Sequence, residues 1–267
     1  MKKVSYLFIT IAALLLCACG ENEPVINPNS TDGALPGKFS VSNTAKVQFS
    51  QGNLQYQAST YSCRFATNQW DVIGQANKNI SPDYAGWIDL FCWGTGGQPY
   101  LYEVNTDLYR NDTPYDWGHN PIANGGDKKD LWRTLTQSEW EFLILQRNRA
   151  TELCSCGKVA GINGLILLPD NWSGSIAELK EAYSAGEWRN TMEPKGAVFL
   201  PAAGIREGNY DVSVVGENGF YWSKTPYKDL YSEKEKAYNL FFNTSDNQLN
   251  TDSYRYRYYG CAVRLVK

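Results

Sequence analysis

The order of patterns along the chain constrains its fold most: short strand-like runs lie towards both ends, and helical patterns lie between them. Apolar residues alternate on either side of a Gln51-Gly52-Asn53 turn, which predicts a β-hairpin over residues 47–56. Further strands are predicted at residues 164–168, 197–201, 220–223, 237–242 and 261–266. Because strands and helices are grouped and do not alternate one by one, we expect an α+β fold without repeated βαβ units.

Two helices are predicted in the middle of the chain. Thr136-Gln137-Ser138-Glu139 has the S/T-x-x-E pattern of a capping box, in which two side chains satisfy each other's unpaired backbone donors. Trp140, Leu143 and Ile144 follow with helical spacing, so we expect a helix over residues 137–148. Residues 176–184 (IAELKEAYS) predict a second helix.

The composition argues against a nucleic-acid-binding protein and indicates a core rich in aromatic residues. The formal net charge is -3, so the chain has no basic excess with which to neutralise nucleic-acid phosphates. Aromatic residues make up 14% of the chain. A large aromatic side chain buries about 150–250 Å². We therefore expect the following aromatic residues to lie in the core: Trp132, Trp140, Phe199 and Trp222.

The N-terminus has the pattern of an export signal. Lys2 and Lys3 precede an apolar run over residues 4–16, which is shorter than the roughly 20 residues that span a bilayer. The following Leu16-Cys17-Ala18-Cys19 resembles a bacterial lipobox and predicts cleavage before Cys19 and lipid on that residue. We expect a signal peptide at 1–18, a lipidated Cys and flexible tether at 19–37, and one domain at 38–267. The expected location is the outer membrane, lipid-anchored and surface-exposed.

Cysteine chemistry gives no defined site. The cysteines after Cys19 are odd in number, so they cannot all pair within one chain, and the sequence sets no disulfide pattern among Cys63, Cys92, Cys154, Cys156 and Cys261. Cys154-Ser155-Cys156 has no His nearby, and we interpret it as exposed or partly paired thiols in a loop. We expect no metal and no other cofactor.

Several segments resemble one protein superfamily. Residues 132–142 (WRTLTQSEWEF) resemble the RLPTEAEWEYA segment of the formylglycine-generating-enzyme, or sulfatase-modifying-factor, superfamily. Four further segments resemble motifs of a lipoprotein-rich relative, the FISUMP-type (major paralogous domain) family: 49–56 (FSQGNLQY), 198–206 (VFLPAAGIR), 219–225 (GFYWSKT) and 259–266 (YGCAVRLV). The resemblance covers residues 38–267. It implies a C-type-lectin-like fold with its N- and C-terminal strands together, long irregular loops and flanking helices.

The enzyme chemistry of that superfamily is not expected here. In the superfamily two closely spaced cysteines near the C-terminus hold copper and the substrate thiol, whereas Cys261 is the only cysteine in the last hundred residues. The chain has a single His, His119, and no G-x-S-x-G motif that would provide a nucleophilic serine for it to activate. We therefore expect a protein that is not an enzyme; a degenerate member of the enzyme superfamily is one alternative. Arg133, Arg206 and Arg264 lie within the motifs, and we expect them to form structural ion pairs.

The C-terminal segment has the composition of a recognition surface. Tyrosine provides a large rigid contact area with a hydroxyl, and Asn and Ser adapt their hydrogen bonds. If residues 254–258 (YRYRY) form a strand, the three Tyr lie on one face and both Arg on the other. Within the implied fold, a related group of proteins diversifies this segment to bind varied ligands. The predicted contact residues are Tyr227, Tyr231, Asn243, Asn247, Tyr254, Tyr256 and Tyr258.

The leading hypothesis is a lipid-anchored protein of the cell envelope that binds an external glycan or protein through this C-terminal segment. A second hypothesis is a structural or tip subunit of a surface assembly. A third interpretation of the tyrosines is that they cover the core of an aromatic-rich fold. The expected partners are thus a surface glycan or protein, and a membrane through the lipid anchor, without nucleic acid.

Overall fold

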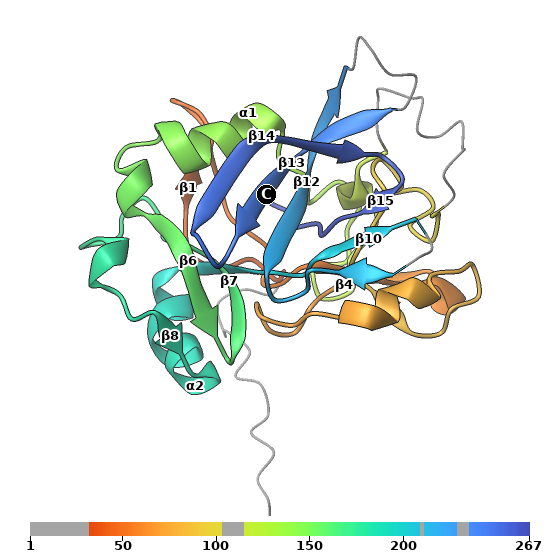
Figure 1. Cartoon of the computed structure of the whole chain (residues 1–267), viewed down its shortest axis with the longest axis horizontal. Coiled ribbons are helices and arrows are strands. Elements are labelled where there is room, and N and C mark those ends of the chain that lie inside the picture. The colour runs from red at the N-terminus through yellow and green to blue at the C-terminus, as the bar shows by residue number, and fades with distance from the viewer. Residues whose placement is uncertain (1–31, 103–114, 209–210, 229–234) are drawn as a thin grey trace, which may run out of the picture.

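A computed structural model describes residues 32–102, 115–208, 211–228 and 235–267 of the chain. The predicted signal peptide, the predicted lipidation site Cys19, the first part of the predicted tether and Tyr231 lie outside these residues. The architecture is mixed α+β and consists mostly of small antiparallel sheets with a few short helices (Figure 1).

Five small sheets carry the fold within the described ranges. Their orders are β1-β2, β4-β3-β5, β8-β6-β7-β9, β11-β10-β15 and β12-β13-β14, with antiparallel neighbours except for the parallel pair of β6 and β8. The strands are β1 (Phe39–Ser40), β2 (Lys46–Val47), β3 (Leu54–Gln57), β4 (Ser62–Phe65), β5 (Trp87–Ile88), β6 (Cys154–Val159), β7 (Ile162–Leu167), β8 (Ala182–Tyr183), β9 (Val198–Pro201), β10 (Ile205–Glu207), β11 (Val212–Ser213), β12 (Asn218–Tyr227), β13 (Lys236–Asn243), β14 (Gln248–Tyr256) and β15 (Tyr259–Gly260).

The helices are short. Two α-helical turns each continue into a π-helical turn: α1 (Gln137–Glu141) into η5 (Phe142–Gln146), and α2 (Ala185–Glu187) into η8 (Trp188–Met192). The 3₁₀ turns are η1 (Ala58–Thr60), η2 (Gly74–Asn79), η4 (Trp117–His119), η6 (Ala150–Glu152), η7 (Ile176–Glu178) and η9 (Glu193–Lys195). The predicted capping box is confirmed at α1, where Thr136 Oγ1 accepts from the backbone N–H of Glu139 and the Glu139 carboxylate accepts from that of Thr136.

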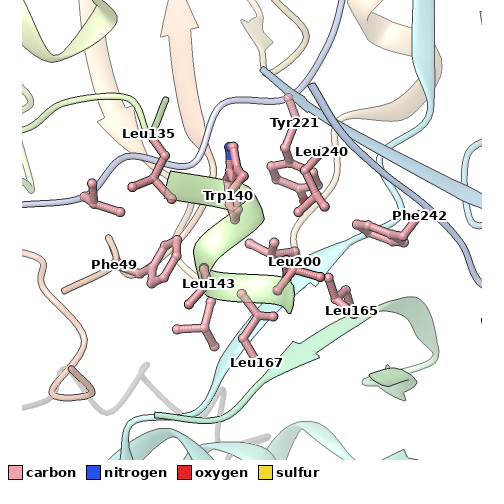
Figure 2. Packing of buried hydrophobic residues seen from close by; sticks show 14 of the residues in the cluster. Phe49, Leu135, Trp140, Leu143, Leu165, Leu167, Leu200, Tyr221, Leu240 and Phe242 are labelled. Carbon is pink, nitrogen blue, oxygen red and sulfur yellow. The ribbon is translucent and has the colours of Figure 1, made fainter. Parts of the chain in front are cut away.

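The two largest apolar clusters lie on opposite faces of the β12-β13-β14 sheet. On one face, Trp140 of α1 packs with Tyr221, Leu240 and Phe242 of the sheet (Figure 2). On the other face, Phe220, Trp222 and Ala237 belong to a second cluster, which includes Trp132. Phe199 lies in a third cluster around α2 and η8. The four aromatic residues predicted as core are all at most 3% exposed, so that prediction is confirmed.

The two ends of the described chain pair with each other. Phe49 forms a β-bridge with Val266, and the backbones of Gln48 and Lys267 exchange hydrogen bonds of 2.9 and 3.0 Å. Arg133, just before α1, forms a second bridge with Val266. The C-terminal segment therefore runs between the N-terminal segment and the start of α1.

Buried guanidinium groups join irregular segments to one another. Arg264 donates to Asn53 Oδ1 at 3.3 Å and to Gln69 Oε1 at 3.2 Å, and Arg206 donates to Leu90 O at 3.2 Å. The predicted ion pair is present for Arg133, which holds Glu139 through both carboxylate oxygens at 2.8 and 2.6 Å. For Arg206 and Arg264 the prediction is wrong among the described residues: Arg206 donates to the Leu90 carbonyl and to Cys92 Sγ at 3.7 Å, and Arg264 donates to amide oxygens, all of them neutral.

Several predicted elements differ from the structure. The hairpin over 47–56 is wrong: β2 pairs with β1, and β3 pairs with β4 and β5, so the two arms have different partners. The first helix begins at Gln137 as expected but ends at Gln146. The helix over 176–184 is also wrong, since η7 and β8 occupy that range and α2 begins after Ser184, which caps it together with Glu187.

Two further strand assignments need correction. Within 261–266 only Cys261, Ala262 and Val266 form β-bridges, and these are isolated because they meet different neighbouring segments. Cys154 and Cys156 lie on β6 and not in a loop; Cys154 is buried, Cys156 is half-buried, and the five cysteines that the structure describes are all free thiols. The strands over 220–223 and 237–242 are confirmed as parts of β12 and β13. Those over 164–168 and 197–201 are confirmed as β7 and β9, except that Leu168 and Ala197 lie just outside them.

Candidate functional site

The candidate site lies where the sheet of β12, β13 and β14 extends beyond the helix that covers it. Tyr227 pairs with Lys236, and Lys236 pairs with Tyr256, so these three residues form one row across the sheet. Tyr238 and Tyr254 form a second pair two positions further along. Because side chains alternate along a strand, all five share one face. In Figure 1 the end of β12 that carries Tyr227 projects at the top of the view, beyond α1.

The covered half of the same face ends at the start of α1. The backbone N–H of Gln137 donates to Thr225 Oγ1 at 3.0 Å, and its side-chain amide donates to Thr251 O at 3.3 Å. Gln137 thereby fixes the N-terminus of α1 against β12 and β14. Beyond this point the tyrosines are half-exposed, and Tyr254 retains 38% of its surface.

The exposed rings pack against one another around a cation. Tyr227 and Tyr254, from the two outer strands, stack with ring centroids 3.9 Å apart. Tyr238 lies edge-on to Tyr227 at 5.1 Å. The Nζ atom of Lys236 lies 5.1 Å from the ring centroid of Tyr254 and 5.2 Å from that of Tyr256, a geometry that favours cation–π attraction.

The turn between β14 and β15 adds two more rings. Tyr256 and Tyr258 stack with centroids 5.4 Å apart and planes 6° apart, and Tyr259 stands edge-on to both. We call the combined set the tyrosine surface: Tyr227, Lys236, Tyr238, Tyr254, Tyr256, Tyr258 and Tyr259. Its tyrosines contact each other and keep part of their surface exposed, and Tyr259 also packs against the second apolar cluster.

Both arginines of the YRYRY segment point away from this surface. The Arg255 guanidinium lies 4.7 Å from the centroid of the Phe220 ring, and that of Arg257 lies 4.3 Å from the Trp93 ring. Arg257 is 1% exposed, donates to Lys236 O at 2.9 Å and pairs with Glu235 at 3.6 Å. The segment therefore alternates as the sequence predicts, although β14 ends at Tyr256. Arg257 holds the turn between β14 and β15 from the face opposite the tyrosine surface.

Burial favours the protonated form of two phenols of the surface, those of Tyr238 and Tyr258. Burial and the neighbouring phenols of Tyr259 and Tyr256 raise the pKa of Tyr258 to about 12. Burial and the carboxylate of Asp252 also raise the pKa of Tyr238. These hydroxyls can thus both donate and accept hydrogen bonds, which suits recognition of a polar ligand.

The predicted residues Asn243 and Asn247 lie elsewhere. Asn243 is the last residue of β13, and Asn247 lies in the turn that joins β13 to β14. Asn243 is seven positions along β13 from Lys236, or about 23 Å at about 3.3 Å per residue. Asn243 Oδ1 accepts from the backbone N–H and the hydroxyl of Ser245, and Asn247 Oδ1 accepts from the backbone N–H of Cys156 at 2.8 Å. The two amides serve the turn and are not brought to the tyrosine surface.

The amino-acid sequence does not single out Lys236 as a site residue. Its signal is weak, because a lone lysine at the start of a strand is common, and its position under three rings depends on cross-strand pairing. Tyr238 and Tyr259 belonged to the same Tyr-rich segment and could have been chosen from the alternation with Lys236 and the proximity to Tyr258.

Among the described residues, the single histidine makes its contacts away from this surface. His119 pairs through Nδ1 with Asp130 in an exposed loop, and Tyr115 stands edge-on to its ring at 5.0 Å. Among the described residues, no cluster of three or more His, Cys, Asp or Glu side chains is placed to hold a metal ion. Within the same ranges, no helix is both long enough and apolar enough to cross a membrane.

No protein-family model, curated protein or solved structure matches this chain.

Proposed function

We propose that this protein binds an external ligand, a glycan or a protein, through the tyrosine surface. The observation that carries the proposal is the gathering of Tyr227, Tyr254 and Tyr256 around Lys236 on the part of a sheet face that α1 leaves open. Three further tyrosine rings pack against these: Tyr238, Tyr258 and Tyr259. Half-exposed aromatic rings offer apolar faces on which a sugar ring or a peptide side chain can stack, and their hydroxyls add directional hydrogen bonds.

Preorganisation supports a binding role. The rings already contact each other, and Arg257 holds the turn that carries Tyr256 and Tyr258, so little side-chain entropy remains to be lost when a ligand binds. The strands beneath are part of the core sheet, which gives the surface a rigid support.

The proposal extends to the fold, the anchor and the location. We propose a C-type-lectin-like arrangement, supported by the paired chain ends and the long irregular segments. Lipid on Cys19 would hold the protein in the outer membrane with the tyrosine surface directed outwards. We propose no enzymatic activity.

The test is a glycan array screened with the purified chain, followed by pull-down from surface extracts. A triple variant, Tyr254→Ala with Tyr256→Ala and Tyr258→Ala, should abolish binding while the chain remains folded. The matched control is Tyr61→Ala with Tyr115→Ala, which removes two tyrosines that are 77% and 47% exposed and lie outside the tyrosine surface.

The outcomes separate the hypotheses. Binding that survives in the triple variant contradicts the proposed site. Absence of any glycan or soluble protein ligand, together with stable copurification of envelope proteins, would instead favour a structural subunit of a surface assembly.

A further inference from the structure

A second candidate site lies at the opposite end of the molecule from the tyrosine surface. A groove of about 680 Å³ is lined by Lys38 before β1, Lys46 of β2, Trp172, and Lys195 of η9. In Figure 1, β1 and α2 lie at the left and lower left, whereas the tyrosine-bearing end of β12 lies at the top. The volume falls within the roughly 300–1,000 Å³ that is typical of small-ligand sites.

Two glycines form the close contact between the walls of this groove. A Cβ atom on Gly37 would lie 2.3 Å from Gly196 O, and Gly196 has a φ of +90°, which side chains rarely adopt. The backbone N–H of Asp170 also donates to Lys38 O at 3.1 Å, which joins the segment around Asp170 to the segment before β1. The groove is therefore built by backbone contacts that leave its interior open.

Asp170, the one carboxylate in the lining, is already occupied. It accepts from the Ser40 hydroxyl at 2.7 Å, from Lys46 Nζ at 2.9 Å and from the buried Arg147 at 3.3 Å. Burial acts to raise the pKa of Asp170, but the hydrogen bonds from Ser40 and Lys46 outweigh it and leave the pKa below its usual value. The charge of this carboxylate is thus balanced by Lys46 and Arg147 without the other two lysines.

Lys38 and Lys195 remain as uncompensated cations. Both are exposed, and neither has a carboxylate within 4.0 Å among the residues that the structure describes. The protein as a whole carries a net negative charge, so a lysine-lined groove is a local departure from its surface.

An indole stands beside these cations. Trp172 is half-buried, and Lys195 Nζ lies 5.7 Å from its ring centroid. Arg149 donates to Trp172 O at 3.0 Å, and Arg147 donates to Leu168 O at 2.9 Å, so two guanidinium groups hold the loop that carries the indole. The groove thus presents a fixed aromatic side chain together with positive charge.

We propose that this groove binds an acidic saccharide, with the sugar ring against Trp172 and its carboxylate or sulfate between Lys38 and Lys195. A free inorganic anion would use the lysines but would gain nothing from the indole. A neutral sugar would use the indole but would leave both lysines unpaired. The combination favours a ligand that carries both features, and this site is independent of the tyrosine surface.

The experiment is calorimetric titration of the full chain with tetragalacturonate and with a heparin-derived tetrasaccharide. We expect at least one of these probes to bind, and maltotetraose and inorganic phosphate to bind at least tenfold more weakly. The double variant Lys38→Gln with Lys195→Gln should raise the Kd about tenfold, which corresponds to about 1.4 kcal/mol, because it removes the two cations that would pair with the acidic group. Raising the salt concentration should weaken binding in the wild type.

The matched control is Lys128→Gln with Lys129→Gln, which removes the same charge from an exposed loop outside the groove. We expect the control and the tyrosine triple variant to keep the Kd within twofold. We expect the two lysine double variants to keep the urea midpoint of the wild type. Absence of binding to both acidic probes overturns the proposal, as does an equal loss in the control. Binding to phosphatidylglycerol vesicles that the groove variant loses, without saccharide binding, would also overturn it and assign the groove to a lipid headgroup.

Discussion

The two halves of one sheet face differ in what covers them. In the covered half, Tyr221 and Phe242 stack at 6.0 Å beneath α1, and both are fully buried (Figure 2). In the open half, Tyr227 and Tyr254 stack at 3.9 Å, and Tyr254 keeps 38% of its surface. Both pairs are aromatic and lie on the same face of one sheet, so the position of one short helix separates core from surface.

The two halves also differ in the hydrogen-bond partners that the protein provides for a tyrosine hydroxyl. The Tyr221 hydroxyl donates to Pro201 O at 2.7 Å and accepts from Asn53 Nδ2 at 3.1 Å. Burial raises the pKa of Tyr221, so the phenol stays protonated. A buried hydroxyl with both partners inside the protein specifies packing, whereas a hydroxyl on the open half can serve a ligand.

The largest effect should follow from breaking the covered half. Tyr221→Ala removes a fully buried ring and leaves the amide of Asn53 and the carbonyl of Pro201 without their partner. We expect a loss of about 4 kcal/mol in the free energy of unfolding, measured by urea denaturation. A loss below about 1 kcal/mol would show that the covered half is not a stabilising core.

A buried carboxylate gives the interior a pH dependence. Asp89 accepts from Asn77 Nδ2 at 2.7 Å and from the backbone N–H of Ile73 at 3.0 Å, and burial raises its pKa from 3.8 to about 6. The folded state therefore holds this proton more tightly than the unfolded state. The contribution is fully present below about pH 4 and is lost as the pH rises through 6, by about 3 kcal/mol in total.

The measurement is the urea midpoint from pH 4 to pH 7 for the wild type and for Asp89→Asn. Subtracting the two curves removes the contributions of other carboxylates. The difference should contain the fall assigned to Asp89; parallel curves would contradict the raised pKa.

A smaller change should weaken the helix that divides the two halves. Thr136→Ala removes the side-chain acceptor of the capping box at α1, and we expect a loss of about 1 kcal/mol in thermal or urea unfolding. The exposed neighbour Ser138 is the control, and Ser138→Ala should cost less than about 0.5 kcal/mol. Equal effects at the two positions would argue against a specific role for the cap.

The smallest effect on stability should come from the open half. Tyr254→Ala removes one stacked ring from the surface, and we expect a cost of about 1 kcal/mol or less, in contrast to Tyr221→Ala. If the Tyr254 variant is as unstable as the Tyr221 variant, the open half is part of the core. If it is stable and loses the ligand, the difference between the two halves is functional.

Local patterns were the predictable part of the fold. The capping box at Thr136 and Glu139 acts over three residues, so the sequence alone located the start of α1 correctly. Ser184 and Glu187 form the same capping-box pattern at the start of α2, whereas the apolar spacing of residues 176–184 predicts a helix that ends at Ser184. Strand-forming runs were found, but their partners were not, since Leu54 pairs with Phe65 and not across the Gln51-Gly52-Asn53 turn.

In the candidate site, too, features set by neighbours in the chain were predictable and contacts between strands were not. Alternation along residues 254–258 placed the tyrosines opposite the arginines. Lys236 could not be assigned in this way, because its contact with Tyr254 and Tyr256 requires the register of β13 against β14. Asn243 and Asn247 lie in the same Tyr-rich segment of the sequence but at the far end of the hairpin, since a strand separates its ends by its own length.

The sequence by itself determined the elements whose causes lie within a few residues: the cap of α1, the strand alternation and the apolar runs that form the core. The tertiary structure alone decided which half of the sheet α1 covers, which strands pair, and which oxygens the buried Arg206 and Arg264 reach. The physical reason is range. Backbone capping and side-chain alternation act between neighbours in the chain, whereas burial and pairing depend on segments that lie up to the length of the chain apart.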